Sequence, residues 1–245
     1  MSRPLRVVVE RLHEGEITLD PGAARYVTRV HRLAAGARFV VIDPARGLEA
    51  DAELIGGRGR ELVCRVERVR NAARAEARIT LVQAFGKSDK IDQVVRDATA
   101  LGVSALHVVD GSRSVPRLDE RHVPARQARW AKVAAEAARQ SGRGDVPVLE
   151  GPLSLGAALE RAAAELGPKL VLHPEGKHGL EQALGGWRGK APLWLAIGPE
   201  GGWAPGELEV LAASGFESVT LGAWVLRTET AAVAALGAIV ARLTG

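Results

Sequence analysis

The chain has 245 residues, 47% hydrophobic and 25% charged, which is enough for one large domain or two small ones. This balance excludes a disordered chain, and the 28 glycines and 12 prolines follow no period, which excludes a fibrous one. The only cysteine, Cys64, excludes a disulfide scaffold and indicates a reducing compartment. Because the first residues hold only three consecutive valines, against the ~7–15 apolar residues of a signal peptide, we expect a soluble, cytoplasmic protein with no membrane span.

The charge is uneven along the chain, although 33 basic minus 29 acidic residues leave a total of only +4. Residues 1–75 carry 14 basic and 10 acidic side chains and residues 111–143 carry 8 and 3, whereas residues 144–245 carry 7 and 11. Of the basic residues 27 are arginine, whose guanidinium suits paired hydrogen bonds to phosphate and stacking on bases. Genome composition alone can make a sequence arginine-rich, but the clustering favours a polyanionic partner.

Alternating side chains predict a hairpin in the first seventy residues. From Leu48 to Leu54 apolar residues alternate with acidic ones, the glycine-rich stretch 56–59 provides a turn, and Leu62–Val69 returns as a β-rich run. Residues 70–77 lose this alternation and become small and polar, which is typical of a linker.

One short helix is expected before the hairpin. Asp20 is a favourable cap and Pro21 fits the first helical position, so the helix should start there and run to the turn at Gly36. The apolar residues that it carries are Tyr26, Val30 and Leu33. With the short strands around it, this helix predicts a small β-barrel domain.

From Ile79 onward strands and helices alternate, which predicts an α/β domain with a mainly parallel sheet covered on both faces. The expected strands are 79–84, 103–109, 146–149, 169–173, 192–197 and 217–222. The expected helices run from Ser88 to Gly102, over about 121–140, over 154–166, from Pro205 and from Glu229. Residues 231–240 of the last helix are all uncharged and small or apolar, so we expect it to be buried all round, in the core or in a tight subunit interface.

Three loops follow the late strands, and open α/β sheets place their ligands at this edge. The loops are 172–176, 197–202 and 221–229, and together they predict one pocket. The glycines at 198, 201 and 202 let the backbone approach a ligand closely, although Gly-Pro-Glu-Gly-Gly is also an ordinary tight turn. The pattern matches neither a P-loop nor a dinucleotide-binding fingerprint.

A structural role alone can explain part of the segment from Arg227 to Thr230. Thr228 would cap the last helix and Glu229 would favour its positive end. Arg227 does not fit this interpretation, because a cation is disfavoured at a helix N-terminus unless an anion lies nearby. His173 is typical of an ordinary loop or core histidine, and the spacing of the histidines predicts no metal site. No Ser, His and Asp set stands in a nucleophile-elbow context, which argues against a covalent hydrolase.

Several motifs carry a family resemblance over nearly the whole chain. The most specific are Ile197–Gly202 and Leu226–Ala231. Supporting matches are Lys87, Asp89-Lys90, Leu101–Val103, Ser112–Val115, Arg129-Trp130, Gln140–Arg143 and His173-Pro174. In these motifs the chain resembles the bacterial RsmE methyltransferases of the SPOUT superfamily, which methylate N3 of a specific uridine in 16S rRNA of the small ribosomal subunit.

The resemblance implies a PUA-like RNA-binding barrel over residues 1–72 and a SPOUT methyltransferase domain with a deep trefoil knot over 73–245. It implies S-adenosylmethionine as cofactor, the small subunit as partner and a homodimer. The cofactor-binding residues that it implies are Leu172, His173, Pro174, Ile197, Gly198, Pro199, Glu200, Gly201, Gly202, Leu221, Gly222, Val225, Leu226, Thr228 and Ala231.

For catalysis the resemblance and the chemistry of uridine together suggest roles for three residues. Arg227 would stabilise the charge that spreads onto the base carbonyls, and Glu200 or Glu229 would accept the N3 proton unless either only orients a loop. The candidates for RNA binding are Arg29, Arg32, Arg113, Arg129 and Arg143.

Four positions depart from the family pattern. Ala100 and Arg139 stand where the family usually has Glu, Ser88 replaces a common Gly, and Trp224 replaces a common Arg, although an indole could stack on the base. Two alternatives stay open: a SPOUT enzyme for another rRNA or tRNA position, and an RNA-binding ribosome-assembly factor without catalysis. A Rossmann-type methyltransferase fits least, because its glycine loop would follow the first strand of the catalytic domain.

Overall fold

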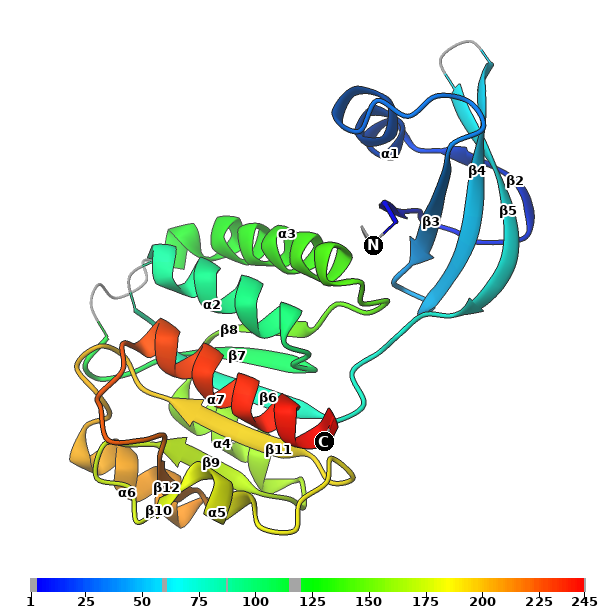
Figure 1. Ribbon diagram of the computed structural model, residues 1–245. Coiled ribbons are helices and arrows are strands. Elements are labelled where there is room, and N and C mark those ends of the chain that lie inside the picture. Colours follow the sequence, from blue (N-terminus) through cyan, green and yellow to red (C-terminus); the bar gives the residue numbers. More distant parts are fainter. Residues whose placement is uncertain (1–3, 59–60, 87, 115–119, 245) are drawn as a thin grey trace. The chain divides into compact units, whose positions relative to one another are not determined.

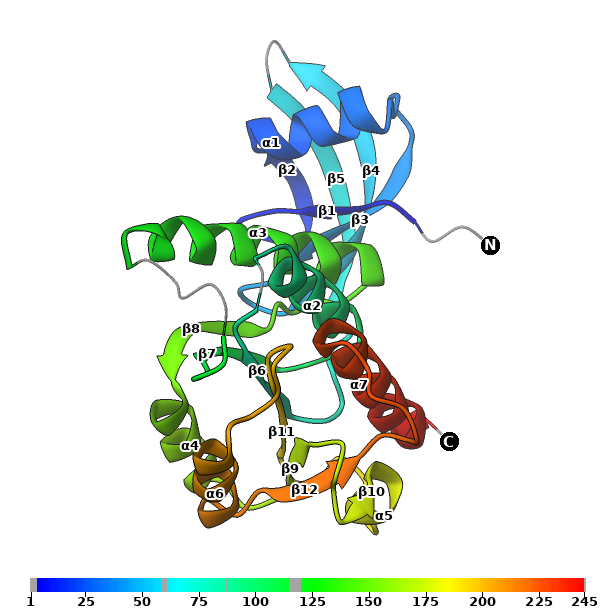
Figure 2. The same cartoon turned by 90° about the vertical axis from the view of Figure 1, so that its left-hand side faces the viewer.

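The computed structural model describes residues 4–58, 61–86, 88–114 and 120–244 (Figure 1 and, turned by 90°, Figure 2). Three residues of the sequence motifs, Gly59, Lys87 and Val115, lie outside these ranges. Within them, none of the helices has the length and apolar character needed to cross a lipid bilayer.

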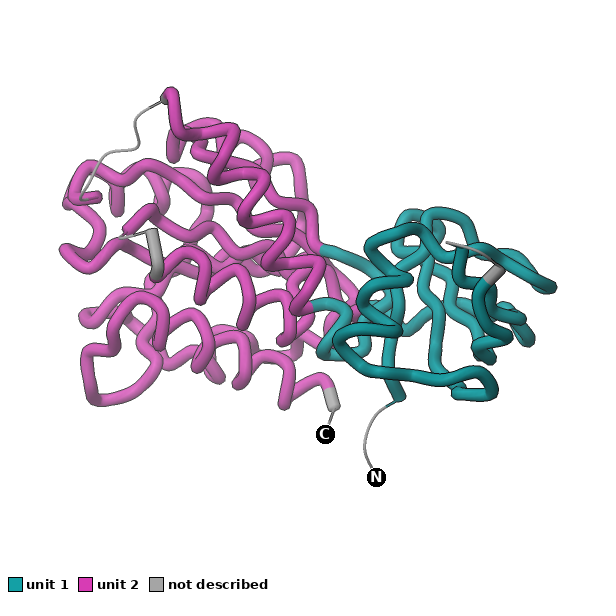
Figure 3. The backbone as a smooth tube through the Cα atoms, turned by 90° about the horizontal axis from the view of Figure 1, so that it is seen from above, with its two compact units in different colours: residues 1–74, 138–146 teal, residues 75–137, 147–245 magenta. Residues whose placement is uncertain are grey.

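The chain divides into two compact units, which Figure 3 colours separately. The first unit comprises residues 1–74 and 138–146, and the second comprises 75–137 and 147–245. The second unit is thus interrupted in sequence, because the end of one long helix and the turn after it group with the first unit.

The first unit is built on a five-stranded sheet with the strand order β1-β3-β4-β5-β2. The strands are β1 (Arg6–Val8), β2 (Gly15–Leu19), β3 (Arg38–Asp43), β4 (Leu48–Arg58) and β5 (Glu61–Asn71). Only β1 and β3 pair in parallel, and the other neighbours are antiparallel. β1 and β2 are the edges of this sheet, so a closed barrel stays a prediction.

The hairpin predicted from alternation is confirmed in β4 and β5. Ala50, Ala52 and Leu54 are buried, whereas the acidic residues between them are exposed or half-buried. Its turn, however, was placed too early, because Gly56 and Gly57 lie inside β4. A β-bulge follows Leu54, and Gly56 adopts φ +135°, a conformation that glycine reaches without strain.

The helix predicted after Asp20 is confirmed at its start, but not all the residues predicted to face the core do so. The Asp20 carboxylate accepts the N–H groups of Gly22 and Ala23 at 2.8 and 3.0 Å, at the start of α1 (Pro21–Arg25). The chain continues as a π-helical turn, η1 (Tyr26–Val30). This wider turn changes which side chains face the core, so Val27 is buried and Val30 is 63% exposed.

The second unit is the predicted α/β domain, with a seven-stranded sheet in the order β10-β12-β9-β11-β6-β7-β8. Every neighbouring pair is parallel. The strands are β6 (Ile79–Ala84), β7 (Ala105–Asp110), β8 (Val148–Ser154), β9 (Lys169–Leu172), β10 (His178–Gly179), β11 (Leu193–Ile197) and β12 (Glu217–Thr220). The helices are α2 (Ser88–Ala100), the 3₁₀ turn η2 (Glu120–His122), α3 (Val123–Ser141), α4 (Leu155–Ala163), α5 (Leu180–Leu184), α6 (Pro205–Ala213) and α7 (Thr228–Thr244).

Helices cover both faces of this sheet, as Figures 1 and 2 show. On one face α7 packs on β11 and lies along α2, and on the other α4 packs on β7, β8 and α6. The core under α4 and α6 is continuous across the central strands, where Val82, Ala84, Val171 and Ala196 are buried. This packing places the loops after β9, β11 and β12 at a single edge of the sheet.

Three parts of the second unit differ from the sequence prediction. β8 begins at Val148 and runs on through Gly151-Pro152, which a strand tolerates here because β8 is an edge strand. The short elements β10 and α5 were not predicted. Within the single chain the last helix is not buried all round, since Ala232, Ala235, Leu236 and Ile239 face the core while Ala238 is exposed, and its burial in a subunit interface stays a prediction.

Candidate functional site

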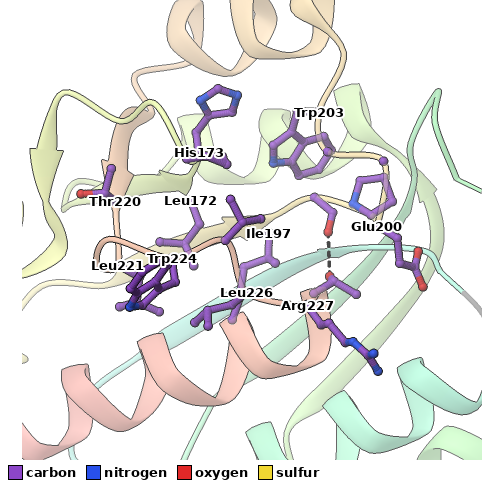
Figure 4. Close-up of a pocket in the computed structure, with 18 of the residues that line it drawn as sticks. Leu172, His173, Ile197, Glu200, Trp203, Thr220, Leu221, Trp224, Leu226 and Arg227 are labelled. Atoms are coloured by element: carbon purple, nitrogen blue, oxygen red, sulfur yellow. Dashed lines mark hydrogen bonds between the residues drawn. The ribbon is translucent and has the colours of Figure 1, made fainter.

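The three loops after β9, β11 and β12 line one cavity of about 560 Å³ in the second unit (Figure 4). These strands are neighbours in the sheet, so their carboxyl ends meet at one edge. All fifteen residues predicted for the cofactor line this cavity, together with Arg113 and Arg227. The lining residues that lie outside the predicted loops and roles are Trp203, Val219 and Thr220, and Trp224 lies in the predicted loop 221–229.

The glycine-rich loop folds tightly because three of its positions carry no side chain. A Cβ on Gly198 would lie 3.1 Å from the backbone nitrogen of Trp203, and Gly202 adopts φ +67°. The Gly202 N–H donates to the Pro199 carbonyl at 2.9 Å, which closes the turn. The tight-turn interpretation is therefore correct as a description of the backbone, and the same turn forms a wall of the cavity.

The loop after β7 is hydrogen-bonded to the glycine-rich loop and to the residues that follow it. Arg113 Nη1 donates to the carbonyls of Gly201 and Trp203 at 3.1 and 3.5 Å. The Glu207 carboxylate, in the first turn of α6, accepts the N–H groups of Ser112 and Ala204, both at 2.8 Å. Arg113, predicted for RNA, thus takes part in fixing the cavity wall.

Thr228 connects the last loop to the glycine-rich loop. Its hydroxyl donates to the Gly198 carbonyl at 2.7 Å and accepts from Gln83 Nε2 at 2.8 Å, across β6. Thr228 was expected to cap α7, and this was wrong. The N–H of Ala231 donates to the Arg227 carbonyl at 2.8 Å, so Arg227 is at the cap position and Thr228 is the first helical residue.

Glu229 is buried and paired rather than exposed in the cavity. It is 4% exposed, it is absent from the cavity lining, and its Oε1 accepts a hydrogen bond from Lys90 Nζ of α2. Burial raises the pKa of Glu229, but the hydrogen bonds from Lys90 and from its own N–H, with the charges of Lys90 and Arg227, lower it more, so this pKa lies below its ordinary value. Glu229 Oε2 has no hydrogen-bond partner among the described residues.

Arg227 and Glu200 are both exposed and lie at the same end of the cavity, away from Trp224 (Figure 4). The Glu200 carboxylate lies beside the backbone of Gly86, just after β6, where a Cβ would come within 2.8 Å of Glu200 Oε2. Arg227 donates no hydrogen bond within the described part of the chain. Two opposite charges thus lie at the same end of the cavity (Figure 4).

His173 behaves as a loop histidine. Its backbone N–H donates to the Val219 carbonyl at 3.0 Å, and its Nδ1 accepts the N–H of Glu175 at 3.2 Å. These bonds shape the loop after β9 at the cavity wall. Among the described residues, no three His, Cys, Asp or Glu side chains form a group that could hold a metal ion.

Two tryptophans line the cavity in opposite ways. Trp203 is buried, and its indole nitrogen has no partner among the described residues, whereas Trp224 is 85% exposed. Trp203 directly follows the glycine-rich motif, and this adjacency is the signal that could have identified it. Val219 and Thr220 end β12, so a rule that includes strand ends would have found them.

The five arginines predicted to bind RNA differ in their exposure and in their ion pairs. Arg29 and Arg32 are exposed in the first unit, and Arg129 is exposed on α3 and paired with Asp92. Arg143 is buried, and its guanidinium makes two hydrogen bonds to the Asp145 carboxylate at 3.0 and 2.8 Å.

The positions that depart from the family pattern have different surroundings. Arg139, in the first unit, lies over the Tyr26 ring at 4.1 Å and donates to its hydroxyl. Ala100 is exposed at the end of α2, and Trp224 is exposed at the cavity.

Comparison with known proteins identifies the family. Residues 73–240 match a family described as the RNA methyltransferase domain. The ribosomal RNA small subunit methyltransferase E of Mycobacterium bovis is 35% identical over 224 residues, which cover 90% of this chain and 84% of the relative. The chain belongs to the ribosomal RNA small subunit methyltransferase E family.

Two further members show how far this family likeness extends. The Synechocystis member is 30% identical over 99% of this chain and 78% of its own. The Neisseria gonorrhoeae member has been crystallised bound to S-adenosyl methionine, and it is 25% identical with a TM-score of 0.84 over 97% of both chains.

Proposed function

We propose that this protein is an S-adenosylmethionine-dependent methyltransferase that methylates N3 of a specific uridine in 16S rRNA. The observation that carries the proposal is that all fifteen residues expected to bind the cofactor line one and the same cavity. Family membership supports the RNA methyltransferase activity, and the Neisseria gonorrhoeae relative, solved with S-adenosyl methionine, supports the cofactor.

The cavity fits such a cofactor in size and chemistry. Its volume of about 560 Å³ lies within the ~300–1,000 Å³ of pockets that bury drug-sized ligands. Leu172, Ile197 and Leu226 offer apolar walls for the adenosine part, while the glycine-rich loop offers backbone polar groups and the buried indole N–H of Trp203 lies behind it. The bound cofactor supplies an activated methyl group, so binding, alignment and charge remain the tasks of the protein.

Proton removal at N3 is assigned to Glu200 rather than Glu229. Glu229 lies outside the cavity lining and its Oε1 is occupied by Lys90, whereas Glu200 lines the cavity and is exposed beside Arg227. In the proposed reaction the N3 proton passes to the Glu200 carboxylate as the base accepts the methyl group. The Arg227 guanidinium stabilises the negative charge on the neighbouring carbonyl oxygens.

RNA would reach this end of the cavity as an unpaired or flipped-out nucleotide, because N3 lies on the pairing edge of the base. Arg29, Arg32 and Arg129 are exposed and suit contacts to phosphate, and Arg113 lies beside the glycine-rich loop. Arg143 contributes to a phosphate track only if its pair with Asp145 opens.

The remaining family features are proposals of the same kind. We assign residues 1–72 to a PUA-like RNA-binding barrel and 73–245 to a SPOUT domain with a trefoil knot, supported by the family and by the α/β sheet. A homodimer through α7 is supported by its half-exposed, uncharged face. An enzyme of ribosomal RNA works where ribosomes are, which keeps the cytoplasm as its expected location.

Primer extension across 16S rRNA tests the proposal. Small subunits that lack the modification are incubated with the protein and S-adenosylmethionine, and a new stop at one uridine, absent without cofactor, is expected because an N3 methyl blocks pairing. No stop on subunits or naked RNA, despite cofactor binding in calorimetry, would favour another RNA and a screen of tRNA. Absence of cofactor binding would favour the non-catalytic assembly factor.

A further inference from the structure

Lys90 of α2 contacts the first turn of α7 through Glu229 and lies outside the cavity lining. We propose that Lys90 is a positioning residue for methyl transfer, which anchors Glu229 and thereby fixes the turn that presents Arg227. The proposal rests on the proposed role of Arg227. It concerns a residue outside the cavity lining, which acts through its neighbours rather than on the base.

The charge pattern around Glu229 needs an explanation. Lys90 is in the first turn of α2 and Arg227 is at the cap of α7, and a helix dipole disfavours a cation at both places. The buried carboxylate of Glu229, at the N-terminal end of α7, compensates these two positive charges. It accepts a hydrogen bond from Lys90, and it attracts the charge of Arg227. Lys90 itself keeps 25% of its side chain exposed, whereas the Glu229 side chain keeps 5%.

Arg227 sits beside a turn that is anchored at two successive residues. Thr228 is tied to Gly198 and Gln83, and Glu229 is tied to Lys90. The first tie leads to the cofactor wall, while the second leads to α2, which lies along α7. The Arg227 side chain makes no hydrogen bond within the described residues, so the position of its guanidinium depends on these two anchors of the neighbouring turn.

A purely structural ion pair would behave differently from a positioning pair. Removing one partner leaves a buried charge and destabilises any protein, so loss of activity in a single variant would not distinguish the two. Replacing both partners by apolar residues of similar volume usually restores stability. A positioning role predicts that activity does not return with it.

The test compares Lys90→Met, the double variant Lys90→Met/Glu229→Met and the conservative Lys90→Arg. The matched control is Arg96→Met, which breaks an exposed ion pair with Asp97 within the same helix. Melting temperature, cofactor Kd and kcat for methylation of small subunits are measured for each variant. The first turn of α7 is followed by hydrogen exchange of residues 227–231.

We expect the double variant to regain most of the melting temperature that Lys90→Met loses. Its kcat should stay about 10- to 100-fold below wild type, since a misplacement of about 1 Å can cost about 10²-fold, while its cofactor Kd changes little. Lys90→Arg should keep most of kcat because it keeps the cation. Exchange at 227–231 should rise in Lys90→Met and in the double variant but not in Arg96→Met.

Two results would overturn the proposal. One is a double variant that regains kcat together with stability, and the other is a Lys90→Met variant whose defect lies in cofactor affinity. If the wild-type protein methylates no RNA, the proposed function fails, and the exchange measurement alone then decides whether Lys90 orders the turn.

Discussion

Two neighbouring groups of residues at the cavity make different kinds of contact. In the neutral group, uncharged hydrogen bonds run from Gln83 through Thr228 to the Gly198 carbonyl. In the charged group, Arg227 and Glu200 are exposed, and their side chains form no hydrogen bond within the described residues. Binding a flexible cofactor favours a preformed wall, whereas a site that must admit a nucleotide has to stay open.

This difference assigns separate tasks to neighbouring residues. Thr228 and Arg227 are adjacent in sequence, yet the Thr228 hydroxyl bonds to the Gly198 carbonyl while the Arg227 side chain is exposed (Figure 4). Variants in the neutral group should therefore change cofactor affinity, and variants in the charged group should change turnover. Each prediction below would sharpen this separation or break it.

The largest effect is expected for Glu200→Gln, which keeps the shape of the side chain and removes its basicity. If Glu200 accepts the N3 proton, kcat should fall by about 10²–10⁴-fold, the usual contribution of a general base. Cofactor Kd in calorimetry should stay near the wild-type value. Raising the pH should restore part of the rate, because N3 then loses its proton to solvent, and a pH-independent defect would argue against the assignment.

Arg227→Ala should reduce kcat by about 10²–10³-fold, the range for removing one charge-stabilising donor. Arg227→Lys is the matched control, since it keeps a cation and should retain part of the rate. The measurement is methyl transfer to small subunits at saturating cofactor. Normal turnover in Arg227→Ala with bound cofactor would show that the charge-stabilising role is wrong.

Thr228→Val is expected to act in the neutral group. It removes the hydroxyl that satisfies the Gly198 carbonyl, and an unsatisfied buried group costs about 1–3 kcal/mol, so cofactor Kd should rise about 5- to 150-fold. Thr228→Ser keeps the hydroxyl and should bind nearly as wild type. If Thr228→Val lowered kcat and left Kd unchanged, the neutral and charged groups would not have separate tasks.

How well the sequence predicts an element of the fold depends on how far apart in the chain the interacting residues lie. Alternation at Leu48–Leu54 predicted β4 because a strand period needs only local information. The π-helical turn after Arg25 and the bulge after Leu54 are local too, but they change the period on which such a prediction depends.

The site shows the same limit more sharply. Glycine patterning at strand ends predicted the cavity wall, since the parallel order brings those ends together. The Lys90–Glu229 pair joins residues 139 positions apart, and no motif contains both. The pairing of Arg143 with Asp145 is close in sequence, but only the structure shows that this arginine is buried.

The smallest predicted effect is on stability against pH. The pKa of Glu229 lies below its ordinary value of 4.5, so its charge stabilises the fold above about pH 4.5, and this stabilisation is lost as the pH falls through the lower value of the folded state. Glu229→Gln should therefore melt below wild type at pH 7, and the two melting temperatures should converge in acid. Parallel curves from pH 7 to pH 3 would mean that the Lys90–Glu229 pair adds no net stability, in which case its remaining role would be to position Arg227.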